Sequence, residues 1–332
     1  MAKCRKVFIA WSRLSSRTKR YARILKLKIF FVRDRPPYLR CIFYTLRKLL
    51  RERSDIVFVQ LAPGPLLMLA SILKYIRGYI LIADMHSFFV RPSSAGGAII
   101  NKPFVYFLRF CDMIMVHSGA VKNMLPRKIK RKTIVVYDPP IDIGRVKLQP
   151  KKEEFTIVFP ASFAKDEPIE NIIMAVKRLS QRGMNIKLLI TGRYERRREL
   201  LKYSDGKNIV FTGFLPTEKY YELLNSCDLI AALTKVSYSL MAVALEAMSI
   251  GKPLLLSDKP VFKKFFNKGV IYTDNSIDDL EKKIEMAYKN PSQLEKLSKE
   301  MMQVRMRYYA TFRAITRKLL ELLENLCKKR KN

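Results

Sequence analysis

The sequence is poor in the residues that build metal and disulfide sites. It contains only two histidines and five cysteines, and no cysteine pair has CxxC or CxH spacing. The cysteines are Cys4, Cys41, Cys111, Cys227 and Cys327. An odd number of scattered cysteines is not typical of a disulfide framework or a zinc site, and it favours a reducing compartment. Two histidines without a carboxylate cluster beside them likewise predict no metal site.

Long hydrophobic runs are also missing. The charged start of the chain leads into a short apolar run, Val7–Trp11, which is shorter than the roughly 7 to 15 residues of a secretory signal core. One uncharged stretch, Ile56–Leu73, reaches 18 residues, but the Pro-Gly-Pro sequence at 63–65 interrupts it. We predict a strand, a turn and a helix there rather than a transmembrane span, and a protein that stays inside the cell.

Acidic residues are few. The chain has 29 Asp and Glu against 64 Lys and Arg, which gives a net charge of +35. Residues 1–53 hold 17 of these basic residues against only Asp34 and Glu52. Such a surface attracts nucleic acid, an anionic membrane surface or diphosphate-bearing substrates, with a merely solvated basic surface as the alternative. No helix-turn-helix, zinc or RNP-like motif is present, so nucleic acid is not the favoured partner.

Short β-rich runs alternate with longer segments of helical period, which is typical of parallel sheets with crossover helices. In the first half, the predicted strands are Lys6–Trp11, Lys28–Val32, Ile56–Gln60, Tyr79–Ala83, Met113–His117 and Thr133–Tyr137. Helices are predicted between them, for example at Ser16–Leu25 and Tyr38–Arg51. A polar stretch near 143–153 follows two prolines and predicts the end of an N-terminal domain, residues 1–145.

The alternation restarts after this linker. The predicted strands are Phe155–Phe159, Lys187–Thr191, Ile209–Thr212, Leu229–Leu233, Leu254–Ser257 and Val270–Tyr272. The predicted helices are Ile169–Gln181, Glu195–Tyr203, Thr217–Asn225, Met241–Ile250 and Ser276–Lys289. We therefore predict a second Rossmann-like domain at 153–300. A C-terminal helix follows at 301–332, and we consider that it packs back on the first domain.

The segment from Ser226 to Pro253 carries the most specific signal. It combines a strand ending at Leu233, a polar loop, and a helix that begins near Leu240–Ala242 and ends in Gly-Lys-Pro. A helix N-terminus after a parallel strand presents free N–H groups and the positive end of its dipole, which suits a diphosphate. Glu246, one to two turns inside this helix, can accept two hydrogen bonds from a ribose diol, with a surface glutamate as the alternative.

This segment resembles the signature of glycosyltransferase family 4 and its relatives, in which two spaced glutamates precede a Met-x-x-Gly-x-Pro ending. The resemblance extends to Asn208–Leu215 and Tyr220–Asp228, which look like the family's elements that hold the nucleobase. It implies an α/β protein of the GT-B type, with two Rossmann-like parallel-sheet domains facing a cleft. It also implies a nucleotide diphosphate sugar as co-substrate, without a cofactor or a metal.

The resemblance further implies a donor site on the second domain. Its predicted residues are Lys165, Arg193, Phe214, Tyr238, Leu240, Met241 and Glu246. The chain departs from the family pattern at three positions. Tyr238 replaces the first glutamate, and Ser162 and Glu167 replace the arginine and lysine that neutralise the leaving diphosphate.

The loop that contains Ser162 and Glu167 also resembles a loop of a second group of enzymes. Residues 160–169 are similar to the Asp-Glu-containing loop of the β-mannosyltransferases that extend dolichol diphosphate chitobiose. In that lineage the arginine and the first glutamate are also missing. We therefore predict that Lys165 and Arg193 supply the positive charge, with ordinary exposed charges as the alternative.

The first domain offers one histidine at the carboxyl edge of its predicted sheet. His86 follows the strand Tyr79–Ala83, and family relatives often carry a histidine in this loop. A neutral imidazole there would serve as a base or hydrogen-bond the donor sugar, so we predict His86 as the catalytic residue. For His117, after the next strand, a structural role is at least as well supported.

Glycine is absent from the loop after the first strand, where the family often has a glycine-rich one. The segment that starts there carries Arg13, Arg17 and Arg20, which we predict to hold an acceptor phosphate or to contact a membrane. The helix in this segment has an apolar face within residues 21–25 among basic side chains, as interfacial membrane helices do. Packing of that face in the core is the favoured alternative.

These patterns predict a hexosyltransferase that moves a sugar from a GDP- or UDP-sugar to a lipid-linked or other membrane-proximal glycan. We expect it to be cytoplasmic and peripheral on the inner membrane face, with the nucleotide sugar, a lipid-linked glycan and an anionic membrane surface as partners. A glycosyltransferase-like scaffold without catalysis is one alternative, suggested by Tyr238, Ser162 and Glu167. A protein that binds polyanions such as nucleic acid is the other.

Overall fold

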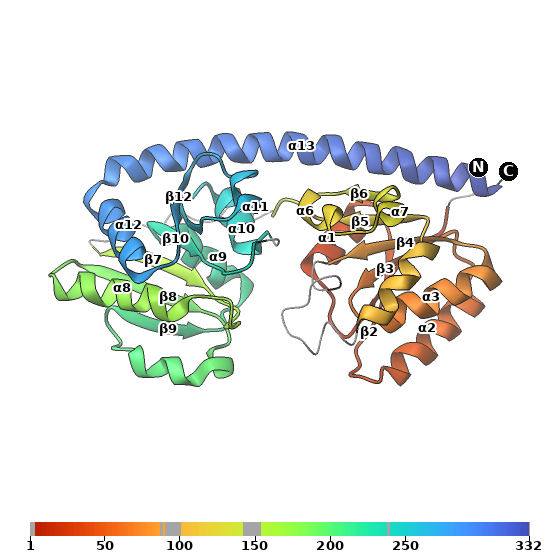
Figure 1. Ribbon diagram of the computed structural model, residues 1–332, viewed down its shortest axis with the longest axis horizontal. Helices are drawn as coiled ribbons and strands as arrows, with labels where there is room; N and C mark the ends of the chain where they lie inside the picture. The colour runs from red at the N-terminus through yellow and green to blue at the C-terminus, as the bar shows by residue number, and fades with distance from the viewer. Residues whose placement is uncertain (1–3, 87–88, 90–100, 142–153, 238–239, 332) are drawn as a thin grey trace. The chain divides into compact units, whose positions relative to one another are not determined.

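The chain folds into two compact units, each built on a six-stranded parallel sheet (Figure 1). The computed structural model describes residues 4–86, 89, 101–141, 154–237 and 240–331. Unit 1 comprises Met1–Pro139 and Thr311–Asn332, and unit 2 comprises Pro140–Ala310. The two parallel sheets confirm the α/β fold class that the alternating pattern predicted.

Sheet A of unit 1 has the strand order β2-β1-β3-β4-β5-β6, all parallel. Its strands are β1 (Lys6–Trp11), β2 (Lys28–Val32), β3 (Ile56–Leu61), β4 (Ile80–Met85), β5 (Met113–Val116) and β6 (Thr133–Val135). Every residue of the central strand β3 is buried, because helices cover both faces of a parallel sheet. All six strands were predicted, with ends that differ by two residues at most.

The helices of unit 1 cover both faces of sheet A. They include α1 (Ser16–Ile24), α2 (Leu39–Arg51), α3 (Gly64–Arg77), the 3₁₀ helix η1 (Tyr106–Phe110), α6 (Gly119–Asn123) and α7 (Arg127–Lys130). On one face, α2 and α3 pack their apolar sides onto alternate residues of β1, β3 and β4. On the other face, α1 packs Tyr21, Ala22 and Leu25 against Phe8 and Phe58. The apolar side of α1 therefore lies in the core rather than at a membrane.

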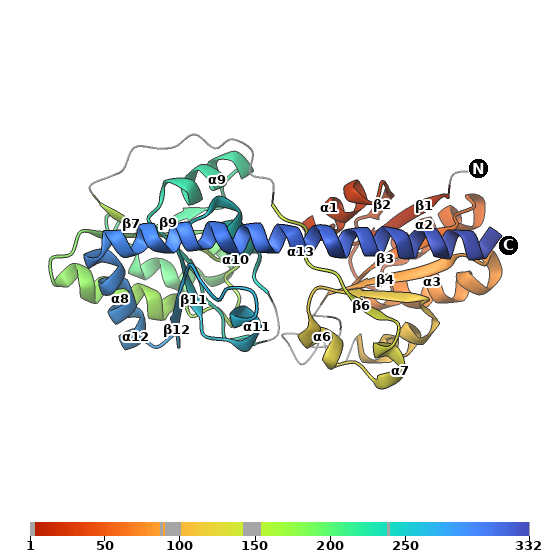
Figure 2. The same cartoon turned by 90° about the horizontal axis from the view of Figure 1, so that it is seen from above.

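The long helix α13 (Pro291–Lys331) contributes its C-terminal part to unit 1. Phe312, Leu319 and Leu323 are buried in the same cluster as Tyr21 and Phe8, over sheet A (Figure 2). The unit boundary within the helix falls between residues 310 and 311, and the other boundary falls between residues 139 and 140. The predicted linker near 143–153 lies outside the described residues.

The end of α13 also corrects the expectation for the cysteines. Cys4, just before β1, forms a disulfide with Cys327, near the end of α13. The two residues are 323 positions apart, and only the packing of α13 on sheet A brings them together. Spacing in the sequence carries no signal for such a pair. Cys41, Cys111 and Cys227 are free and buried.

Sheet B of unit 2 has the order β12-β11-β10-β7-β8-β9, again all parallel. Its strands are β7 (Phe155–Pro160), β8 (Ile186–Thr191), β9 (Ile209–Gly213), β10 (Leu229–Ala232), β11 (Leu254–Ser257) and β12 (Val270–Thr273). The helices are α8 (Ile169–Gln181), α9 (Thr217–Ser226), α10 (Ala242–Ile250), α11 (Pro260–Lys263) and α12 (Ile277–Lys289). Each of the six strands was predicted, as were α8, α9, α10 and α12.

One predicted helix of unit 2 has a different form. The segment Tyr194–Tyr203 is a 3₁₀ helix, η2, with a break at Arg197, where φ is −145° and ψ is 58°. Only Leu200 is buried within it, and its central residues are charged. A segment with a single buried apolar side chain gains too little from packing to hold a regular α-helix.

The uncharged stretch from residue 56 to residue 73 forms β3, a turn and most of α3, as predicted. In the part of the chain that the structure describes, no helix has both the length and the apolar character needed to cross a membrane.

Candidate functional site

The carboxyl edge of sheet B carries most of the residues predicted to bind the donor. The loops after β7 and β8 approach closely there, because Gly192 follows β8 with φ +138°. A Cβ at this position would lie 2.0 Å from the carbonyl oxygen of Ala161, so only glycine permits the approach. Arg196 donates to the carbonyl of Ser162 at 3.2 Å and ties the two loops together.

Glu167 organises the loop after β7. Its Oε1 accepts from the N–H and the hydroxyl of Ser162, at 3.0 and 2.9 Å, and its Oε2 accepts from the N–H of Ala164 at 3.2 Å. Burial raises the pKa of Glu167, although these hydrogen bonds oppose the shift. The two residues that replace the family's basic pair thus hold each other and shape the loop.

Lys165 and Arg193 remain available on this edge. Lys165 is exposed in the loop that Glu167 shapes. Arg193, just after β8, is exposed as well, and its guanidinium stacks over the ring of Phe214, 5.2 Å from the centroid. Phe214 follows β9 and is 71% exposed. The structure therefore brings two of the predicted donor-binding residues together as one exposed cation–π pair.

A buried polar network fixes the neighbouring strand ends, and no motif in the sequence indicated it. Thr234, after β10, donates from its hydroxyl to Asp166 at 2.7 Å, and its N–H donates to the hydroxyl of Ser257 at 2.9 Å. Ser257 in turn donates to Asn275, after β12, at 2.7 Å. Four loops at the carboxyl edge of sheet B are thereby held in fixed positions.

The helix α10 begins at this edge. Its N-cap residue, Met241, makes no capping hydrogen bond through its side chain, and the N–H of Ala244 in the first turn donates to the carbonyl of Met241 at 3.2 Å. Leu240 is buried and Met241 is half-buried beside them. The first turn contains no acidic residue, so the positive end of the helix dipole is not neutralised.

Glu246 lies about one turn inside α10 and is half-buried. The hydroxyl of Tyr220, on α9, donates to its Oε2 at 2.5 Å. Burial and the Glu246 carboxylate both raise the pKa of Tyr220. Tyr220 was not identified from the sequence as a partner of Glu246, because a contact across two helices leaves no pattern in the chain. Tyr238, also predicted to bind the donor, lies outside the described residues.

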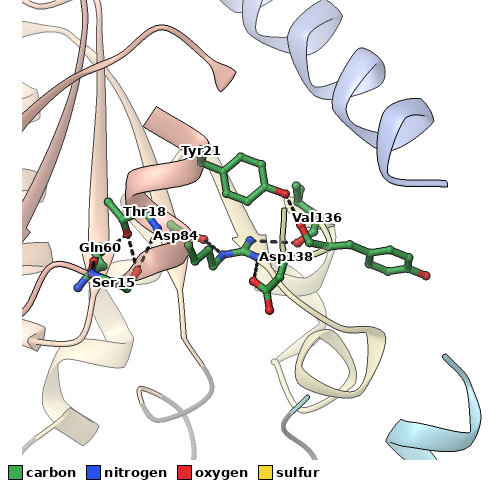
Figure 3. A network of polar contacts seen from close by, with 9 residues as sticks. Ser15, Thr18, Tyr21, Gln60, Asp84, Val136 and Asp138 are labelled. Carbon is green, nitrogen blue, oxygen red and sulfur yellow. Dashed lines mark hydrogen bonds and ion pairs between the residues drawn. The ribbon is translucent and has the colours of Figure 1, made fainter. Parts of the chain in front are cut away.

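The carboxyl edge of sheet A has a buried charge network around Arg17 (Figure 3). Arg17 donates from Nε to Asp84 at 2.9 Å, from one terminal nitrogen to Asp138 at 2.5 Å, and from the other to the carbonyl of Val136 at 3.0 Å. Burial acts to lower the pKa of Arg17, but the carboxylates of Asp84 and Asp138 outweigh it and raise that pKa. Burial also acts to raise the pKa of Asp138, whereas the guanidinium lowers it overall.

This network corrects one expectation for the acceptor side. Arg17 is 8% exposed and joins α1 to the ends of β4 and β6, so its contacts do not support the predicted role in binding a phosphate. Arg20 donates to the carbonyl of Pro139 at 2.9 Å and is half-buried. Arg13 is exposed.

Gln60, on β3, positions the loop that precedes α1. Its carbonyl oxygen accepts from the N–H of Ser15 at 3.0 Å and from the hydroxyl of Thr18 at 2.7 Å, while its amide donates to the carbonyl of Arg13 at 2.7 Å. Ser15 also caps α1 by accepting from the N–H of Thr18. These bonds hold the loop that stands where the family often has a glycine-rich one (Figure 3).

The two histidines both follow strands of sheet A. His86 comes directly after β4, and His117 comes directly after β5. The Nε2 atom of each is buried without a hydrogen-bond partner. Burial lowers the pKa of His86, and it lowers the pKa of His117 to about 4. Both imidazoles are therefore neutral near pH 7, the state that a general base requires.

A pocket opens at the carboxyl ends of β1 and β2. It is lined by Ser12, Arg33, Asp34, Arg35 and Pro36. The hydroxyl of Ser12 donates to the carbonyl of Asp34 at 2.6 Å and joins the two loops that form the pocket. Its two arginines are exposed, and neither was selected from the sequence.

Across the ranges that the structure describes, no group of three or more His, Cys, Asp or Glu side chains is placed to hold a metal ion.

Comparisons with known proteins fit both units. Residues 141–304 match the family model described as "Glycosyl transferases group 1", and residues 6–145 match the model described as "Glycosyltransferase Family 4". No curated protein sequence matches the chain.

Several solved structures share the fold. The structure of Anabaena Alr3699/HepE in complex with UDP-glucose has a TM-score of 0.74 and 13% identity, over 96% of this chain and 99% of that one. Sucrose-phosphate synthase from Thermosynechococcus elongatus has a TM-score of 0.70 and 14% identity, over 97% of this chain and 99% of that one. The lipopolysaccharide outer core galactosyltransferase WaaB has a TM-score of 0.65 and 13% identity, over 96% and 99%.

Proposed function

The chain is a glycosyltransferase of the GT-B type with a group 1 domain at residues 141–304, and on this premise we propose that it transfers a hexose from a UDP- or GDP-sugar to a lipid-linked or other membrane-proximal glycan. The proposal is supported mainly by the groups that lie together at the carboxyl edge of sheet B. There the uncapped N-terminus of α10, Glu246 and the exposed Arg193–Phe214 pair all follow strands of one parallel sheet.

Each of these groups matches one part of a nucleotide diphosphate sugar. The N-terminus of α10, which lacks a side-chain cap, and the exposed Lys165 and Arg193 suit the diphosphate, whose negative charge grows as the sugar leaves. The carboxylate of Glu246 accepts hydrogen bonds from the ribose hydroxyls, with Tyr220 holding one of its oxygens in place. The exposed ring of Phe214 offers a stacking surface for the base.

The proposed reaction joins the acceptor hydroxyl to the anomeric carbon of the donor. The new bond forms from the acceptor oxygen, the bond between the anomeric carbon and the diphosphate oxygen breaks, and its electron pair leaves with the nucleoside diphosphate. The hydroxyl proton passes to a base, for which we propose the neutral imidazole of His86. His117 is more deeply buried, at 8% exposure, and suits a structural role better.

The acceptor is proposed to bind the carboxyl edge of sheet A. Arg17 is ion-paired with Asp84 and Asp138. We therefore propose that the exposed arginines Arg33 and Arg35 bind the acceptor phosphate in its place. They line a pocket, and arginine binds phosphate oxygens through paired N–H groups. We propose that a lipid phosphate or diphosphate binds in this pocket. WaaB, a lipopolysaccharide outer core galactosyltransferase, shares the fold, and a lipid-linked acceptor is therefore the one to test first.

The test is a turnover screen with the purified chain. UDP- and GDP-sugars are offered with and without a polyprenyl-diphosphate glycan, in the presence and absence of EDTA. We expect nucleotide release that depends on the acceptor and is insensitive to EDTA. Glu246→Ala should weaken donor binding, and His86→Ala should keep donor binding but lose transfer. The matched controls are Glu195→Ala, an exposed glutamate of η2, and His117→Ala. Absence of turnover and of donor binding with every sugar would contradict the proposal.

A further inference from the structure

Helix α2 has an unusual exposed face. Its solvent-exposed residues are Leu39, Arg40, Phe43, Tyr44, Arg47, Leu50 and Arg51. Four of these seven are large apolar side chains, with exposures of 69% for Leu39, 57% for Phe43, and 42% for both Tyr44 and Leu50. The other three are arginines. A surface helix of a soluble domain normally places polar and charged residues of both signs on this side.

The exposed face is not needed to hold α2 in place. The opposite side packs Cys41 and Leu49 into the core, and the hydroxyl of Thr45 accepts a hydrogen bond from the indole of Trp11 at 2.8 Å. The exposed apolar side chains thus do not explain the position of the helix. They are available to a partner outside the described chain.

The neighbouring helix α3 continues the same character. It packs beside α2 on the same face of sheet A (Figure 1). Its exposed side chains are Ile72, Tyr75 and Ile76, at 50%, 74% and 67% exposure. The ring of Tyr75 contacts that of Phe110 at 5.8 Å, and Phe110 contacts the 59% exposed Tyr106 at 6.0 Å, so η1 extends the aromatic surface.

The charges within the two helices have one sign, although Lys48 pairs with Glu52 and Lys74 pairs with Asp112 just outside them. Neither residues 39–51 nor residues 64–77 contain an aspartate or glutamate, whereas together they contain six lysines and arginines. In η1, the guanidinium of Arg109 stacks over Tyr106 at 4.6 Å. Basic side chains between exposed Leu, Ile, Phe and Tyr side chains match the interface of an anionic bilayer, where apolar groups enter the acyl boundary and arginines reach the headgroup phosphates.

We propose that the exposed residues of α2 and α3, here named the α2–α3 face, dock unit 1 on an anionic phospholipid surface. This proposal rests on the membrane-proximal acceptor of the proposed function and gives it a physical location. It also moves the predicted membrane contact from α1, whose apolar side is buried in the core, to α2 and α3. A nucleic acid is the less suitable partner, because its recognition would use the arginines but not the aliphatic side chains between them.

The test uses flotation of the full-length chain with lipid vesicles. One set is phosphatidylcholine alone, and the other contains about one third phosphatidylglycerol, so that the surface potential is strongly negative. The wild type should float with the anionic vesicles and stay behind with the neutral ones. Phe43→Ser combined with Leu50→Ser should lower the partition constant about tenfold, because two apolar side chains no longer enter the interface. The matched control is Leu201→Ser with Met306→Ser, two exposed apolar residues of unit 2 that should leave it unchanged.

A second pair of variants tests the charge. Arg40→Ala, Arg47→Ala and Arg51→Ala together should lower the partition constant about a hundredfold. The matched control removes the same charge from exposed positions of unit 2, through Lys264→Ala, Lys268→Ala and Lys299→Ala. It should lower the partition constant only a few fold. All variants replace exposed side chains, and the emission of the single, fully buried Trp11 checks that unit 1 remains folded.

The outcomes separate this proposal from the proposed function. If the wild type does not float with anionic vesicles, or if both matched controls lose as much binding as the test variants, docking by the α2–α3 face is wrong. Nucleotide-sugar binding, measured on the same samples, would remain intact in that case. If the wild type binds a duplex oligonucleotide but not vesicles, and the arginine variant loses that binding, the surface serves nucleic acid instead. Absence of nucleotide-sugar binding with normal flotation would contradict only the proposed function.

Discussion

The guanidinium of Arg17 donates to the carboxylate of Asp84 at 2.9 Å, and both side chains are buried, at 8% and 0% exposure. Asp138 binds the same guanidinium from the end of β6. Three elements that are far apart in the sequence are thereby joined at the carboxyl edge of sheet A. Each partner in such a network depends on the others, because an uncompensated buried charge is costly.

Replacing Arg17 with methionine should therefore destabilise unit 1 strongly. Asp84 and Asp138 would remain buried without their cation, and the loss in the free energy of unfolding should be about 3 to 5 kcal/mol. Urea unfolding, followed through the emission of the buried Trp11, measures this loss. The control is Arg13→Met, an exposed arginine of the preceding loop, which should have little effect. Equal unfolding midpoints for Arg17→Met and the wild type would show that the network does not stabilise the fold.

The stability of unit 1 should fall as the pH falls from 6.5 to about 4. Burial lowers the pKa of His117 from 6.5 to about 4, so the unfolded chain takes up this proton first. The stabilisation from neutral His117 is fully present above pH 6.5 and is lost through this window, to an extent on the order of 3 kcal/mol. Urea unfolding of the wild type and of His117→Gln at several pH values measures the difference. The same pH dependence in both proteins would rule out His117 as the source.

The loop after β7 should depend on the carboxylate of Glu167. Both carboxylate oxygens of Glu167 accept hydrogen bonds, so in Glu167→Gln the NH₂ group must face a donor that has lost its acceptor. This should lower the free energy of unfolding by about 1 to 3 kcal/mol. Thermal unfolding measures this cost, with Glu195→Gln as the exposed control. If the two variants unfold at the same temperature, the three hydrogen bonds to Glu167 are not needed to hold the loop.

Phe214 should contribute to donor affinity without contributing to stability. Its side chain is 71% exposed and contacts Arg193, so Phe214→Ala removes little from the core. Loss of a stacking surface for the base should weaken binding by about 1 to 2 kcal/mol, a factor of roughly ten or more. Calorimetric titration with the nucleoside diphosphate measures this effect, and Leu201→Ala is the exposed control in the same unit. Undiminished affinity in Phe214→Ala would place the base elsewhere.

Much of the fold could be predicted because it depends on local patterns. β1, β2 and β11 have the predicted bounds, and α8 begins and ends at the predicted residues. Their apolar residues recur with the period of a strand or of a helix, and turn residues bound them. The segment Tyr194–Tyr203 was predicted as an α-helix but is a broken 3₁₀ helix, because its charged residues carry no amphipathic pattern that packing could reinforce.

The candidate site was predictable only in part. Glu246, Arg193 and Phe214 were found through a family resemblance and lie at the expected edge of sheet B. Tyr220, Gln60 and Thr234 were missed because their contacts join residues that are 26, 42 and 68 positions apart. Such pairings arise only when helices and strands that are far apart in the sequence pack against one another. The disulfide between Cys4 and Cys327 was missed for the same reason.

The central claim is that the carboxyl edge of sheet B binds a nucleotide diphosphate sugar through Glu246. Isothermal titration of the wild type, Glu246→Ala and Tyr220→Phe with UDP and with GDP tests it most directly. The wild type should bind one of the two nucleotides, and Glu246→Ala should bind it at least about tenfold more weakly, since two charge-assisted hydrogen bonds are lost. Tyr220→Phe should have a smaller effect, because the carboxylate itself remains. Equal affinity of Glu246→Ala and the wild type, or no binding of either nucleotide to the folded wild type, would contradict the claim.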